Sequence, residues 1–232
     1  MNTTAKMSYQ KNTNSLLVIG VLFSAFLILS NLAENKICEI YGFYFAGGLV
    51  FFPLTYIFDD VLTEVYGFKV CRKIIWLAFF SNLVVIVGLY LVMLIKPAAE
   101  WQNQEAFDTI YHQSFRVLLA SFISFLFGEF INAFVLAKLK IKTKGKHFWF
   151  RAILSSALGV FVENTIFCFI AFLGIMEFSV IWNIIITGYL FKLFYEIVAL
   201  PLTYKIVNFL KNKDGIDYYD YKTSFNPFSI SN

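Results

Sequence analysis

The pattern of the chain is set by sixteen residues, Phe52-Pro53-Leu54-Thr55-Tyr56-Ile57-Phe58-Asp59-Asp60-Val61-Leu62-Thr63-Glu64-Val65-Tyr66-Gly67. This stretch begins as apolar as a membrane span and then places three carboxylates within six residues. Asp60 and Glu64 are four residues apart, so on a helix they share one face. Because a carboxylate is costly to bury in a bilayer, these residues mark a candidate functional site.

The composition is that of a membrane protein. The 232 residues are 59% hydrophobic and 15% charged, with a mean hydropathy of +0.70. A soluble domain is usually about 45–50% apolar and about 25% charged. Cys38, Cys71 and Cys168 are scattered without disulfide or zinc spacing, and His112 and His147 lack metal-ligand spacing. We therefore expect a polytopic membrane protein that has no metal site and no cofactor.

Apolar runs predict six membrane-spanning helices. They cover about residues 15–33, 74–95, 115–137, 152–175 and 180–210, and one more begins near Gly42 and leads into residues 52–67. This second run contains Gly47, Gly48 and Pro53, which predict a kink or a broken helix. The last run is too long for a simple crossing, so we expect Pro201 to break it and its distal part to lie near the membrane surface.

Loop charges predict the orientation. With the N-terminus in the cytoplasm, fifteen Lys and Arg residues fall in inside segments and three in outside segments. The basic run at 138–151 is explained by this bias without a nucleic-acid partner. The predicted fold is therefore an all-α, six-helix transmembrane bundle, N-in and C-in, with kinked second and sixth helices. Residues 1–14 form a cytoplasmic N-terminal segment, 15–210 the transmembrane domain and 211–232 a cytoplasmic tail.

Polar residues inside the spans are the candidates for substrate binding. Asp59, Asp60 and Glu64 could instead be solvated at the inner interface, and the asparagines could join helices. Lys192 and Glu196, at positions i and i+4, could form a neutral pair. The candidates are Asp60, Glu64, Glu129, Asn132, Glu163, Asn164, Lys192, Tyr195 and Glu196.

Common enzyme motifs are absent from the sequence. There is no phosphate-binding Gly-x4-Gly-Lys-Ser/Thr loop, no His-Glu-x-x-His and no Gly-x-Ser-x-Gly. We therefore assign no catalytic residues and do not expect an enzyme.

Several motifs together resemble one family. They are Phe52-Pro53-Leu54-Thr55-Tyr56 with Asp60-Val61-Leu62-Thr63-Glu64-Val65-Tyr66-Gly67, then Trp101-Gln102-Asn103-Gln104-Glu105-Ala106-Phe107, Gly128-Glu129-Phe130-Ile131-Asn132, Lys192 with Tyr195-Glu196, Pro201-Leu202-Thr203-Tyr204, and Asp217-Tyr218-Tyr219-Asp220 with Phe225-Asn226-Pro227-Phe228. The resemblance is to the queuosine precursor transporters of the vitamin uptake transporter type, and it covers about residues 30–228. One departure is in the fifth helix, where Val160 and Glu163 stand in place of the family's usual Gln and Asp.

The resemblance implies a multi-pass inner-membrane importer of a 7-deazaguanine base for tRNA modification: 7-cyano-7-deazaguanine, 7-aminomethyl-7-deazaguanine or queuine. A guanine-like edge offers adjacent N–H donors that a buried carboxylate can accept, and its flat ring can stack on Phe or Tyr. We expect Glu129 or Glu163 to accept the donor edge and Asp60, Glu64 and Asn132 to complete the pocket. Lys192 and Glu196 would hold the sixth helix or meet the base carbonyl.

Two other functions fit the same residues. One is the substrate-binding membrane subunit of an energised vitamin-type uptake complex. The other is a structural membrane protein whose acids only join helices. An intramembrane enzyme lacks a recognisable nucleophile–base pair. The sequence leaves open the coupling ion and the oligomeric state, a homo-oligomer included.

Overall fold

The computed structural model describes residues 3–33, 36–40, 43–111 and 115–228. Most of this chain is helical, and a short hairpin of two strands joins the first two helices. The elements are α1 (Thr3–Ala33), β1 (Ile37–Ile40), β2 (Phe43–Ala46), the 3-10 turn η1 (Gly47–Val50), α2 (Phe52–Tyr66), α3 (Phe68–Met93), α4 (Gln104–Tyr111), α5 (Phe115–Lys142), α6 (Phe148–Phe172) and α7 (Phe178–Asp214). His112 and residues 229–232 of the tail lie outside the described residues.

Five of the described helices are long and apolar enough to cross a membrane. The segments are Asn14–Ala33, Phe68–Met93, Leu119–Lys142, Phe148–Phe172 and Phe178–Asp214. Their outward faces carry many exposed large apolar side chains, for example Val84 on α3 and Phe194 on α7, which suits contact with lipid. The predicted membrane class is confirmed. The count of six spans and the orientation remain predictions.

The second apolar run is broken, and its first part is a strand where the sequence predicted helix. Residues 37–40 and 43–46 pair as an antiparallel hairpin, with Ile37 opposite Ala46. Gly47 packs so tightly on the end of α1 that an added Cβ would lie 2.7 Å from the carbonyl oxygen of Ala33. Pro53 then lies in the first turn of α2, where its missing N–H is not needed. The chain is therefore broken before a short helix; Gly42, the predicted start, is outside the described residues.

The predicted break at Pro201 is also wrong. Helix α7 passes through Pro201 and continues to Asp214, a length of 37 residues, or about 55 Å at 1.5 Å per residue. That exceeds the roughly 30 Å hydrocarbon core of a bilayer, so one end of α7 extends beyond the membrane. A kink at Pro201 stays a prediction.

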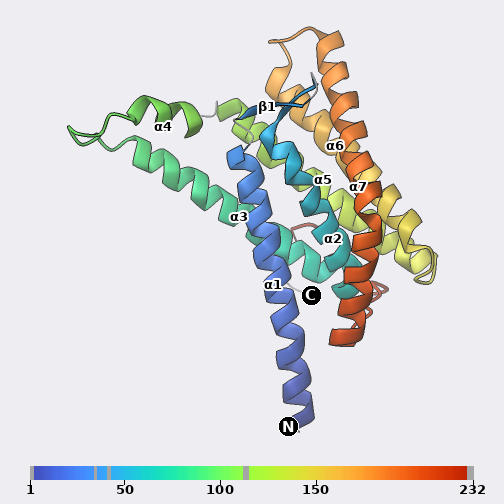
Figure 1. Cartoon of the computed structure of the whole chain (residues 1–232). Helices are drawn as coiled ribbons and strands as arrows, with labels where there is room; N and C mark the ends of the chain where they lie inside the picture. The colour runs from blue at the N-terminus through green and yellow to red at the C-terminus, as the bar shows by residue number, and fades with distance from the viewer. Residues whose placement is uncertain (1–2, 34–35, 41–42, 112–114, 229–232) are drawn as a thin grey trace.

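Helix α2 lies at the centre of the bundle. It packs against α1, α3, α5 and α7, while α5 and α6 form a long hairpin of which α6 packs against α7. In Figure 1, α2 lies between α1 and α7, and α3 leans away toward α4. The N-terminal end of α1, the α5–α6 turn and the C-terminal end of α7 lie toward the bottom of that view, whereas the strands and the α6–α7 turn lie toward the top.

The segment after α7 folds back over the corner between α2 and α3. Gly67 allows this corner, because it has a φ of 85° and an added Cβ would collide with the ring of Tyr218. The ring of Phe225 packs against Phe68 with centroids 5.1 Å apart. Hydrogen bonds hold the backbone of the segment. Tyr218 N donates to Val65 O at 3.1 Å, and Trp76 Nε1 donates to Pro227 O at 2.9 Å. Arg72 Nη1 donates to Ser224 O at 3.0 Å and to Asn226 O at 2.6 Å.

Candidate functional site

Four helices bring their polar residues together inside the bundle. Helix α2 turns Tyr56, Asp59 and Asp60 inward, and all three are buried. Glu129 and Asn132 of α5, Glu163 of α6 and Glu196 of α7 are buried as well. The predicted meeting of carboxyl groups from separate helices is therefore present, and the alternative that Asp59 and Asp60 are merely solvated is wrong, since both are fully buried.

Asn132 ties α5 to α2. Its Nδ2 donates to Asp59 Oδ2 at 2.7 Å and to Asp60 Oδ1 at 2.9 Å. Ser156 of α6 donates to Asn132 Oδ1 at 3.5 Å. One amide thus holds two adjacent carboxyl groups, and the interpretation of Asn132 as a residue that joins helices is supported by these contacts.

Lys192 pairs with α6 and not with Glu196. Its ammonium donates to Glu163 Oε1 and Oε2 at 2.9 and 3.0 Å and to Asn164 Oδ1 at 2.9 Å. It also lies 4.4 Å from the centroid of the Phe52 ring. The predicted Lys192–Glu196 pair is therefore wrong. Two acceptors on α6 and an aromatic face offer Lys192 more than a single carboxyl on its own helix.

Glu163 has a second partner that the candidate set omitted. Tyr56 donates its hydroxyl to Glu163 Oε2 at 3.1 Å. The contact is possible because the hairpin helices are close here: a Cβ added to Gly159 would lie 2.8 Å from Gly128 O. Asn164 in turn donates to Ile185 O at 3.5 Å. Glu163, Asn164 and Lys192 thus form one network between α6 and α7.

Several buried carboxyl oxygens have no hydrogen-bond partner among the described residues. They are Asp60 Oδ2 and both oxygens of Glu129 and of Glu196. Glu129 lies beside the Thr55 hydroxyl, whose proton is donated to Phe52 O, and within electrostatic range of Asp59 and Glu163. Glu196 lies beside the Asp60 carboxyl. An unpaired carboxylate is strongly disfavoured at such a place. These acids must therefore stay neutral or receive donors from a ligand.

Glu64 lies apart from this cluster, one helical turn further along α2. It accepts Arg151 Nη1 at 2.5 Å, Arg151 Nη2 at 3.1 Å and Lys211 Nζ at 2.7 Å. Its side chain is 1% exposed, so the solvated alternative is wrong for it too. Arg151, which the sequence placed in the basic run at 138–151, is fully buried at the start of α6.

Some residues were missed by the sequence analysis or are not joined to the cluster. Tyr195 is half-buried on α7 and has no hydrogen-bond partner in the part of the chain that the structure describes. Arg151 and Lys140 were assigned to a basic loop, although a base at the edge of an apolar run could have suggested an ion pair.

Across the described ranges, no three His, Cys, Asp or Glu side chains are grouped to hold a metal ion.

Comparison with known proteins identifies relatives over most of the chain. Residues 46–206 match the model of a family described as "Putative vitamin uptake transporter". The chain is 30% identical over 188 residues, 81% of its length and 82% of the relative's, to a protein of Bacillus subtilis named "Probable queuosine precursor transporter". It is 25% identical over 170 residues, 72% of its length and 70% of the relative's, to a protein of Haemophilus influenzae with the same name. No solved structure shows significant similarity to the chain.

Proposed function

Because the chain belongs to the queuosine precursor transporter family, of the vitamin uptake transporter type, we propose that it imports a 7-deazaguanine base for tRNA modification. The candidate substrates are 7-cyano-7-deazaguanine, 7-aminomethyl-7-deazaguanine and queuine. The names of the two relatives support the substrate class. The polar cluster inside the bundle supports the choice of site.

The unpartnered carboxyl group of Glu129 is the observation that carries the proposed site. Its two buried oxygens are without donors among the described residues, and a guanine-like edge presents adjacent N–H groups that a carboxylate can accept. Phe52 and Tyr56 lie on the two turns of α2 before Asp60, with ring centroids 6.3 Å apart, and their rings offer faces for stacking. Stacking on an aromatic side chain is worth about 1–3 kcal/mol per base in other proteins.

The remaining candidates have roles that follow from their contacts. Asp60 and Glu196 supply further acceptors, and Asn132 holds Asp60 in place. Lys192 orients Glu163. Asn164 supports the ammonium of Lys192. Tyr195 has no hydrogen bond to the cluster among the described residues and keeps its place among the candidates only from the sequence.

The proposed orientation is N-in and C-in, with α2 as a short sixth membrane helix and the chain in the plasma (inner) membrane. The basic ends of α5 and α7 and both chain termini then lie on the cytoplasmic side, as positive-inside bias predicts. The arrangement of these ends toward one side of the bundle supports this orientation.

The test is uptake of labelled precursor by cells that cannot make it. We expect Glu129→Gln and Glu163→Gln each to lower uptake more than about tenfold, since a hydrogen bond to a charged group is worth about 1.5–3 kcal/mol. Glu105→Gln, in the exposed helix α4, is the matched control. Normal uptake in both variants at normal membrane levels would remove these contacts.

Uptake by the purified chain in liposomes separates the importer from its alternatives. An energised complex would require a copurifying ATPase for uptake. A structural membrane protein would leave tRNA queuosine unchanged in a deletion strain that is fed each precursor.

A further inference from the structure

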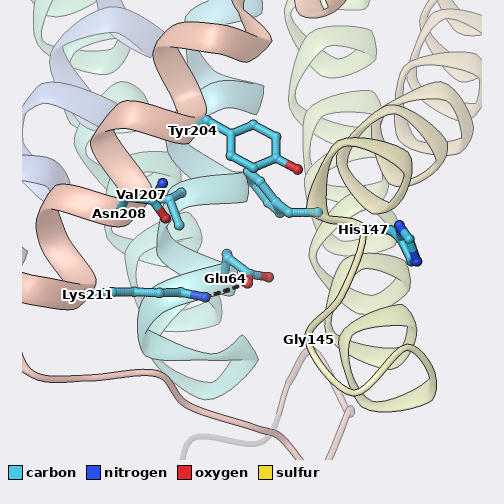
Figure 2. Close-up of a pocket in the computed structure, with 8 residues that line it drawn as sticks. Glu64, Gly145, His147, Tyr204, Val207, Asn208 and Lys211 are labelled. Atoms are coloured by element: carbon cyan, nitrogen blue, oxygen red, sulfur yellow. Dashed lines mark hydrogen bonds and ion pairs between the residues drawn. The ribbon is translucent and has the colours of Figure 1, made fainter.

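A pocket opens at the end of the bundle where α5 turns into α6 and where α7 ends (Figure 2). Its volume is about 190 Å³. Figure 2 shows Glu64 and Lys211 joined by an ion pair at one side of it, with Val207 and Asn208 of α7 nearby and His147 across from them. The pocket is outside the acid cluster to which we assign substrate recognition.

One wall of the pocket is aromatic. The rings of Phe148 and Tyr204 meet edge to face with centroids 5.0 Å apart. The Tyr204 hydroxyl accepts a hydrogen bond from Trp149 N at 2.9 Å. A flat base can therefore find both a ring surface and polar atoms here.

The ion pairs around Glu64 separate this pocket from the buried acids. On α2, Asp60 lies one turn deeper than Glu64, about 6 Å along the helix. On α7, the buried residues Glu196, Thr203 and Val207 are spaced seven and four residues apart and share one face. Two helices thus carry parallel rows of buried residues from the acid cluster to the pocket, and Glu64 with its partners lies between the two.

The partners of Glu64 come from several elements. Besides Arg151 of α6 and Lys211 of α7, Lys140 of α5 lies 3.8 Å away and donates to the Glu64 carbonyl oxygen. Asp217, after α7, accepts Lys140 at 2.6 Å and Lys211 at 2.9 Å. The network therefore closes this end of the bundle only while α7 and the segment after it stay against α2.

The two cations closest to the Glu64 carboxyl, Arg151 and Lys211, hold it in different ways. Arg151 is fully buried and bidentate, which fixes the geometry of the pair. The Lys211 side chain is 22% exposed, faces the pocket and makes single contacts through a flexible stem. Arg151 is thus placed to anchor Glu64, and Lys211 to move.

We propose that the pocket is the cytoplasmic end of the substrate route and that the ion pair of Lys211 with Glu64 is its gate, closed in this structure. This inference rests on the proposed import function. A base leaving the acid cluster along α2 and α7 would reach the pocket only after Lys211 and Asp217 moved away from Glu64.

The gate can be tested by thiol labelling of Val207→Cys from the cytoplasmic face. Val207 is 2% exposed beside the pocket, and the change to Cys is small. Inside-out vesicles would be treated with a membrane-impermeant maleimide, with and without 7-cyano-7-deazaguanine. The chain without the added cysteine is the blank: Cys71 and Cys168 are buried, and any labelling of the half-buried Cys38 is measured there and subtracted. We expect labelling to be slow at rest and to rise severalfold with the precursor.

A second variant tests Lys211 directly. Lys211→Met should raise labelling of Val207→Cys without precursor and should lower uptake while precursor binding to the purified protein persists. Lys213→Met, an exposed lysine in the same last turn, should change neither quantity.

The outcomes separate this inference from the proposed function. Suppose that the chain imports the precursor, but the maleimide labels Val207→Cys at the same rate with and without precursor and with and without Lys211→Met. That result would overturn the gate alone. Loss of precursor binding in Lys211→Met would also overturn it, since Lys211 would then belong to the recognition site. Absence of any precursor import by the unaltered chain would overturn the proposed function and the gate with it.

Discussion

Arg151 and Glu64, 87 positions apart in the sequence, form a buried bidentate ion pair with distances of 2.5 and 3.1 Å. The pair joins the start of α6 to the end of α2, so it fixes the base of the helix hairpin against the central helix. Asp60 and Glu64, one turn apart on α2, therefore have different surroundings. Asp60 lies among other acids, whereas Glu64 is neutralised by cations.

Removing the arginine should destabilise the protein strongly. Arg151→Met removes the bidentate partner of Glu64 but leaves Lys211 at 2.7 Å and Lys140 at 3.8 Å, so we expect a loss at or below the about 3–5 kcal/mol of a buried charge left without any partner. The measurement is the free energy of unfolding in detergent. The double variant Arg151→Met/Glu64→Gln should recover much of the loss, and strictly additive effects of the two changes would contradict a direct pair.

The partner of Lys192 can be identified by paired substitutions. Lys192→Met leaves Glu163 with Tyr56 as its hydrogen-bond donor, so we expect loss of stability and of uptake. Adding Glu163→Gln should restore stability in the double variant, because the uncompensated charge is then gone. Adding Glu196→Gln in its place should not, and rescue by Glu196→Gln would show that Lys192 pairs along its own helix.

Asn132 should be needed to keep the two aspartates together. Asn132→Leu has a similar volume but removes the donor to Asp59 and Asp60, and a buried group left without its partner costs about 1–3 kcal/mol. We expect lower thermal stability and lower precursor uptake. Asn183→Leu, an exposed asparagine on α7, is the control, and equal effects of the two substitutions would argue against the clamp.

The close approach of α5 and α6 should tolerate no added methyl group. In Gly159→Ala the new Cβ would lie 2.8 Å from Gly128 O, a backbone atom that can move only if the hairpin opens. We expect reduced stability and loss of uptake, since Tyr56 and Glu163 meet at this level. Gly88→Ala on α3, where a Cβ meets nothing within 4 Å, should be neutral or slightly stabilising in a thermal unfolding assay.

Acid should release the segment that follows α7. Burial alone would raise the pKa of Asp217, but hydrogen bonds from Lys140 and Lys211 outweigh it and lower the pKa below its usual 3.8. The stability from Asp217 is therefore present above pH 3.8 and is lost as the pH falls through the lowered pKa. The protection of the Tyr218 amide, which bonds to Val65 O, against hydrogen exchange should fall below pH 3.8, measured relative to the exchange rate of an unstructured peptide at the same pH. In Asp217→Asn the amide should exchange faster at neutral pH, and an unchanged rate would contradict the tether.

The sequence predicted the membrane class, most of the long helices and the acids that gather inside the bundle, because these depend on composition and on local spacing. The resemblance carried by Asp60, Glu129 and their neighbours is confirmed at the level of the family. The interruption at Gly47 and Gly48 before α2 was predicted from these residue types, but the hairpin of β1 and β2 was not, because the apolar run of residues 43–46 fits a helix as well as a strand.

Pairing was decided only by the tertiary structure. Lys192 is as near in sequence to Glu196 as a helical pair can be, yet it binds Glu163, which is 29 positions away. Arg151 was one of the loop charges from which the sequence predicted the membrane orientation, and in the fold it is a buried partner of Glu64. A periodic pattern predicts which residues of a helix face inward. The pairing of charges from different helices depends on how the helices cross and rotate against one another. Local spacing along the sequence carries no information on these angles.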